Sequence, residues 1–142
     1  MQRIHVLAVA FMLITGLAAP AAADRPESFI AFAQGLETEA EALGDGAASE
    51  DFLAHTAQFS RDARALADWI QAHNGPVDLP CIFRGMAADV DARAHALTAA
   101  STGEARAREY ASLAELFSHA VIFAGELEVE SPANSFPPAC AG

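Results

Sequence analysis

The chain has 142 residues, and its 19 acidic residues outnumber its 8 arginines, so the formal net charge is −11. Nucleic acid and anionic lipid surfaces repel such a chain, and neither is expected as a binding partner. The length suffices for one domain with a modest core, which is the default expectation.

The first 23 residues have the pattern of a cleavable signal peptide. Arg3 supplies a positive charge, an apolar run follows over residues 4–14, and three alanines end at Ala23. The run is too short to span a bilayer, which takes about 20 apolar residues. We therefore expect residues 24–142 to form a single exported domain, periplasmic or secreted, without a stable membrane anchor. A retained N-terminal anchor is the alternative.

The first two helices are predicted over residues 26–43 and 50–73. Asp24 and Glu27 have capping-box spacing before the first, and Ser49 can cap the second. Glycines follow the first helix, and Asn74, Gly75 and Pro76 stop the second. The predicted core faces are Phe29, Phe32, Leu36, Ala40 and Leu43 on the first helix, and Phe52, Phe59, Ala63, Leu66 and Ile70 on the second.

Two further helices follow. The third starts around residues 78–80, because proline is favoured in a first turn, and ends near Ala100. Ser101 and Glu104 form a capping box that begins the fourth. The predicted core faces are Phe83, Met86, Val90, Ala94 and Leu97 on the third helix, and Tyr110, Leu113, Phe117, Ala120, Phe123, Ala124 and Leu127 on the fourth.

These elements predict an all-α fold, an up-down-up-down four-helix bundle with short connections. Residues 128–142 contain two prolines in succession and form an extended C-terminal strap. In this topology the strap can bring Cys140 back to Cys81, and paired thiols in an oxidising compartment usually form a disulfide. A reactive Cys81 thiol at the start of the third helix is the alternative.

The histidines are the candidate metal ligands. His55, His95 and His119 each follow an acidic residue by four positions, which places both groups on one helix face. The helix projections do not make the three histidines converge, so no metal site is predicted. Haem is a second weak alternative, because Met86 and His119 stand at similar heights on neighbouring helices. No cofactor is expected, and a transition metal or haem remains the alternative.

One polar cluster is a candidate pocket. Arg106, Glu109 and Tyr110 share the inward face of the fourth helix, and His55 is expected at the same end of the bundle. Buried charges are costly unless paired, so the cluster is either a small pocket or a wet bundle end.

The sequence contains no recognisable catalytic motif. It favours a small, non-enzymatic binding or accessory protein that contacts an envelope protein or a small ligand. Trp69 and Ile122, predicted to face outward, are candidate contact residues. A metal- or haem-binding bundle is the alternative function, and a hydrolase that uses His55 and Glu109 is a third. The sequence leaves the oligomeric state open.

Overall fold

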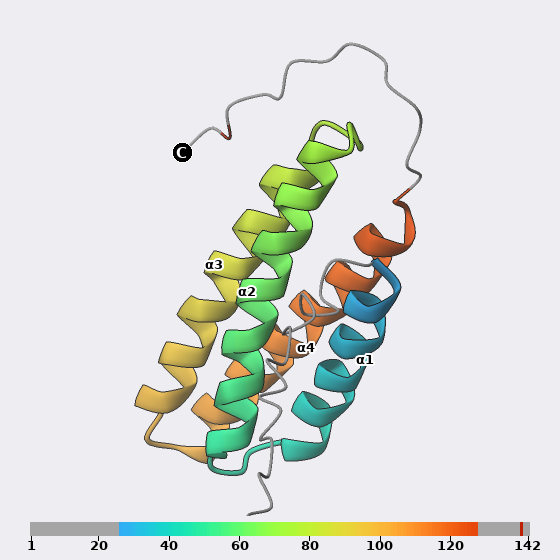
Figure 1. Cartoon of the computed structure of the whole chain (residues 1–142). Coiled ribbons are helices and arrows are strands. Elements are labelled where there is room, and N and C mark those ends of the chain that lie inside the picture. The colour runs from blue at the N-terminus through green and yellow to red at the C-terminus, as the bar shows by residue number, and fades with distance from the viewer. Residues whose placement is uncertain (1–25, 128–139, 141–142) are drawn as a thin grey trace, which may run out of the picture.

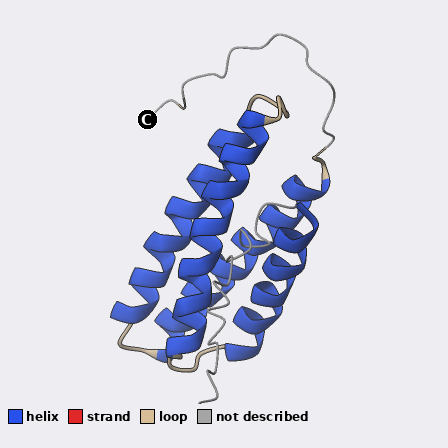
Figure 2. Ribbon diagram, viewed as in Figure 1, coloured by secondary structure: helices blue, strands red, loops and turns tan. Residues whose placement is uncertain are grey.

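The computed structural model describes residues 26–127 and Cys140. It contains four helices: α1 over Pro26–Leu43, α2 over Glu50–Ala72, α3 over Leu79–Ala99 and α4 over Gly103–Gly125 (Figure 1). No strand occurs in this part of the chain (Figure 2). The predicted all-α fold is confirmed.

Local signals explain where the helices begin and end. The Ser49 hydroxyl accepts a hydrogen bond from the Phe52 amide at 3.0 Å and caps α2. Asn74 adopts a positive φ of 53° just after α2, a conformation that asparagine tolerates and that ends helices. The cap of α4 corrects the prediction: it is Thr102, not Ser101, whose side chain accepts a hydrogen bond from the Ala105 amide at 3.1 Å.

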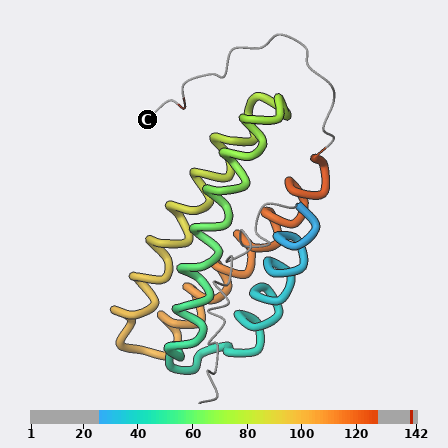
Figure 3. Tube along the Cα trace, in the orientation of Figure 1, coloured from blue at the N-terminus to red at the C-terminus, as the bar shows by residue number. Residues whose placement is uncertain are grey.

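The helices form an up-down-up-down bundle. Each helix packs against the next in the chain, and α4 packs back against α1. The α1–α2 and α3–α4 connections lie at one end, and the α2–α3 connection lies at the other (Figure 3). The closest pairs are α1 with α4 and α2 with α3, whereas α1 and α2 contact each other least.

Aromatic rings join the four helices across the core. Phe59 of α2 contacts Phe29 of α1 with a ring-centroid distance of 5.3 Å and Phe117 of α4 at 4.9 Å. Phe29 also contacts Phe83 of α3 edge-on at 5.6 Å. Full burial of such a ring stabilises the fold by roughly 2–3 kcal/mol.

The predicted core faces are largely buried. The five residues predicted on α2 are all fully buried. Five residues predicted on the core faces of the other helices are only half-buried: Phe32, Leu43, Ala94, Phe123 and Leu127. Of these, Leu127 lies beyond the end of α4 and Leu43 is the last residue of α1. Small residues that no face included are buried where two helices approach closely, among them Ala33, Ala67, Ala87 and Ala114.

Cys81 and Cys140 form the predicted disulfide. Their Cα atoms are 5.4 Å apart, and 59 positions separate them in sequence. Cys81 is half-buried in the first turn of α3, and Cys140 is exposed. The bridge excludes the alternative of a free Cys81 thiol. The predicted strap over residues 128–139 lies outside the described residues.

The predicted signal peptide also lies outside the described residues. None of the four described helices is both long and apolar enough to cross a membrane.

Candidate functional site

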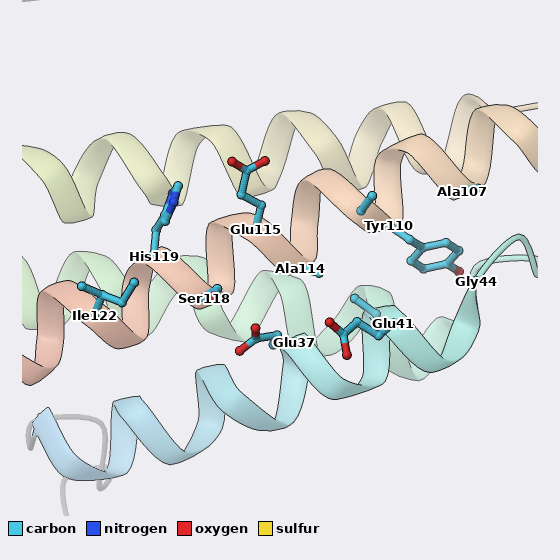
Figure 4. A pocket seen from close by; sticks show the side chains of 12 residues that line it. Glu37, Glu41, Gly44, Ala107, Tyr110, Ala114, Glu115, Ser118, His119 and Ile122 are labelled. Carbon is cyan, nitrogen blue, oxygen red and sulfur yellow. The ribbon is translucent and has the colours of Figure 1, made fainter.

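A groove of about 580 Å³ lies on the surface between α1 and α4 (Figure 4). Lining residues recur every three or four positions on both helices, so each helix presents one continuous face to the groove. The α1 face consists of Glu37, Ala40 and Glu41, with Gly44 just after the helix end, and the α4 face of Ala107, Tyr110, Ala111, Ala114, Glu115, Ser118, His119 and Ile122.

Small side chains leave this surface hollow. On α4, Ala107, Ala111, Ala114 and Ser118 follow one another at intervals of three or four residues. Ala40 lies opposite them on α1 and is fully buried. Because none of these side chains extends beyond its β carbon and one further atom, the two helices approach closely without filling the surface between them.

Three carboxylates border the groove without a counterion. Glu37 and Glu41 lie on its α1 side and Glu115 on its α4 side (Figure 4). Within residues 26–127, none of the three has a hydrogen-bond or ion-pair partner, and all six arginines of this range bind groups outside the groove. The groove lining therefore holds three carboxylates and no arginine, an excess of negative charge that favours a cationic ligand.

Tyr110 lies at the Gly44 end of the groove (Figure 4). Its side chain is 2% exposed, and its ring contacts the Phe52 ring at 5.4 Å. Its hydroxyl has no hydrogen-bond partner among the described residues, which is costly for a buried polar group. Burial raises the pKa of the Tyr110 hydroxyl above its ordinary value, the positive charge of Arg106 opposes this shift, and the negative charge of Glu39 adds to it.

Ile122 and His119 lie at the other end of the groove. Ile122 is 53% exposed there, as the sequence predicted for an outward residue, and His119 beside it is also exposed. Trp69, the second residue predicted to face outward, is half-buried against the core. Its ring stacks on His73 with a centroid distance of 4.5 Å. Ile122 is thus the better candidate for a contact residue.

The candidate pocket residue His55 lies away from the groove. Its Nδ1 is 3.2 Å from a carboxylate oxygen of Glu39. Its ring lies edge-to-face with the Phe32 ring, with a centroid distance of 6.3 Å. Both partners belong to α1, and with His55 they line a separate depression of about 230 Å³ between α1 and α2. His55 and Tyr110 therefore do not share a cavity.

Arg106 and Glu109 are each engaged with other parts of the bundle. The Arg106 Nε donates a hydrogen bond to the Asp45 carbonyl at 2.9 Å and so ties α4 to the α1–α2 connection. Glu109 accepts a hydrogen bond from Arg93 of α3 at 3.3 Å. Of the four predicted pocket residues, only Tyr110 lines the groove.

The candidate metal ligands remain apart. His55 lies in the α1–α2 depression, His119 in the α1–α4 groove, and His95 is exposed on α3. No group of three or more His, Cys, Asp or Glu side chains in the described residues is arranged to hold a metal ion. Met86 is 8% exposed and packs in the core, whereas His119 lies on the surface.

The sequence did contain a signal for the groove. Glu37 and Glu41 stand four residues apart, so their like charges repel each other on one helix face, and α1 has no arginine after Pro26 to neutralise them. For Glu115, the sequence pattern indicates only that it precedes His119 by four positions. The proximity of these three acids depends on the packing of α1 against α4, which no local pattern records.

The chain matches no protein-family model, no curated protein and no solved structure. Its function is therefore inferred from the geometry and charge of the α1–α4 groove.

Proposed function

We propose that this chain is an exported, non-enzymatic binding protein whose contact surface is the α1–α4 groove. The leader pattern of residues 1–23 and the expected disulfide of an oxidising compartment support export. The absence of a recognisable catalytic motif in the sequence supports binding rather than catalysis.

The observation that carries the proposal is the combination of charge and surface in the groove. Glu37, Glu41 and Glu115 have no counterion among the described residues, and they border a floor of alanines. At the same site the buried Tyr110 hydroxyl has no hydrogen-bond partner. A ligand with cationic and apolar groups would relieve the repulsion between the carboxylates and cover the floor.

The shape of the groove fits binding better than chemistry. The groove is open to solvent along its length, so a bound molecule keeps one side in water. Reactions that depend on strong electrostatic stabilisation usually need water to be excluded. Binding has no such requirement, because partly exposed interfaces can be specific and stable.

Photo-crosslinking in the producing cells tests the proposal. A photoreactive amino acid at Ile122, at the open end of the groove, should give a discrete adduct. The matched control is Val77 between α2 and α3, which is also a large exposed apolar residue but lies outside the groove. The yield of the Ile122 adduct should decrease several-fold when Glu37→Gln and Glu41→Gln are introduced.

Equal adducts from both positions would show that the groove is not the contact surface. An Ile122 adduct of unchanged yield after loss of the two carboxylates would show that their charge does not contribute to binding. Either result would overturn the proposal.

A further inference from the structure

We infer that the α1–α4 groove docks a basic amphipathic helix of another protein. The inference rests on the proposed function and names the class of partner. It follows from the shape of the groove, from its charge and from the lack of a suitable basic helix in the given sequence.

The groove has the length and the floor of a helix-docking site. On the α1 side its lining extends only from Glu37 to Gly44, roughly 10 Å, whereas on α4 it extends from Ala107 to Ile122, roughly 22 Å along the helix axis. A helix of about four turns matches this length, whereas a small molecule is normally enclosed in a compact cavity that buries most of its surface. The alanine floor lets a third helix backbone approach α1 and α4 closely, as small residues do at helix contacts.

The charge of the groove selects a basic partner. Glu37 and Glu41 on one side and Glu115 on the other would flank a helix that lies on the floor. Lysine or arginine on both edges of that helix can reach these carboxylates while its apolar face covers the alanines and Ile122. This is the recognition of an amphipathic helix by a groove, with anchors spaced by three or four residues.

The given sequence offers no such helix. It contains no lysine, and the six arginines within residues 26–127 are already bound elsewhere. The other two, Arg3 and Arg25, are too far apart in sequence to lie on one helix of about four turns. Its own residues 128–142 include Glu128 and Glu130 and no basic residue. A second copy would bring a like net charge. The charge complement must therefore come from a different protein.

Fluorescence anisotropy with labelled peptides tests the inference on the exported, oxidised protein. The first probe is an amphipathic peptide of about 16 residues with leucines on one face and lysines along both edges. The second has the same leucines but glutamates in place of the lysines. The third probe is phenethylammonium, a small aromatic cation. Its binding is measured directly by calorimetry and by its ability to displace the first peptide. Only the basic peptide should bind, and its affinity should fall as salt increases.

Matched variants locate the binding. Glu37→Gln, Glu41→Gln and Glu115→Gln together should weaken the basic peptide about tenfold, because partly exposed charge pairs are individually weak. The control combines Glu27→Gln, Asp51→Asn and Asp89→Asn, which remove the same charge from exposed positions outside the groove and should change affinity little.

A second pair of variants tests the floor. Ala111→Arg places a bulky cation in the groove and should abolish binding of the basic peptide. Ala88→Arg adds the same group at an exposed position of α3 and should preserve binding. Circular dichroism confirms that each variant retains its helices.

The outcomes separate the inference from the proposed function. Equal binding of the basic peptide to the groove variants and to their controls would overturn the inference, as would equal binding of the acidic peptide. Binding of phenethylammonium without the peptide would assign the groove to a small cation and keep the proposed function. A groove-dependent Ile122 adduct in cells, with no peptide binding, would also overturn only the inference. Failure of both experiments would overturn both.

Discussion

Tyr110 combines full burial, a free hydroxyl and two charged neighbours in one side chain. Among the described residues, its hydroxyl is the buried side-chain polar group without a hydrogen-bond partner. Burial without a partner disfavours the ionised form of a phenol more than the neutral form. Arg106 opposes this effect and Glu39 reinforces it, and the net result is a raised pKa for Tyr110.

This raised pKa gives a prediction with a defined sign. As the pH rises through about 10, the ordinary tyrosine pKa, the unfolded chain releases the proton before the folded chain does. The free energy of unfolding should therefore be intact below pH about 10 and decrease above it. The chain has one tyrosine, so tyrosinate absorbance reports Tyr110 directly. The titration midpoint should be higher in the folded protein than in concentrated urea.

Tyr110→Phe is the control for this titration. It removes the titrating group, so the contribution of Tyr110 to the alkaline loss of stability should disappear. At neutral pH the variant should be as stable as the parent or more stable, by up to about 1 kcal/mol, because no hydrogen bond is lost. Clear destabilisation in urea unfolding would mean that the hydroxyl has a partner in the folded protein.

At the scale of elements, α4 separates two kinds of side chain on two faces. Leu113 and Phe117 point into the core and are buried, and Tyr110 is buried at the border between the core and the groove. Ala107 and Ala111 face α1, where small side chains allow close approach and leave the groove at the surface. The orientation of α4 in the bundle therefore decides both core packing and the site. Its first turn fixes where the helix begins.

The N-cap of α4 supplies the prediction for this element. Thr102→Ala removes the side-chain oxygen that accepts the Ala105 amide and should lower the free energy of unfolding by about 1 kcal/mol. Ser101→Ala changes the adjacent exposed residue, which the capping-box pattern predicted as the cap, and should have a much smaller effect. Urea unfolding of the two variants measures the difference. A larger decrease in the free energy of unfolding for Ser101→Ala would show that Ser101 is the N-cap.

At the scale of the whole molecule, one covalent bond connects distant parts of the chain. The Cys81–Cys140 disulfide joins the start of α3 to a residue well beyond the end of α4. It lies at the surface and is separate from the aromatic core that holds the four helices together. The bridge should therefore contribute stability without determining the fold.

The double variant Cys81→Ser and Cys140→Ser tests this separation. In the chain-entropy model, a closed loop of about 60 residues stabilises the folded state by roughly 4 kcal/mol. We expect the midpoint of urea unfolding to decrease strongly while the circular dichroism of the folded state stays helical. Loss of helical signal without denaturant would show that the four-helix core does not fold without the bridge.

Much of the fold could be predicted because its signals are local. Apolar spacing placed the faces of the helices, and Ser49, Asn74 and Pro80 marked their ends within a residue or two. The disulfide followed from topology, since the end of α4 and the start of α3 lie at the same end of the bundle. The candidate site was harder to predict. Glu109 belongs to α4, which lines the groove, but it pairs with Arg93 outside it. His55 belongs to α2, which does not line the groove, and it pairs with Glu39.

The sequence by itself determined the four helices, their order and most of their core faces, because these depend on apolar periodicity and on capping and turn residues within short segments. The cysteine pairing followed from the order of the helices and from there being only two cysteines. Only the tertiary structure decided which acids remain without a counterion and where the surface is hollow. Both depend on how two helices distant in sequence, α1 and α4, are rotated and spaced against each other. That geometry brings Glu37 and Glu41 to the same groove as Glu115 and leaves Tyr110 buried at its end.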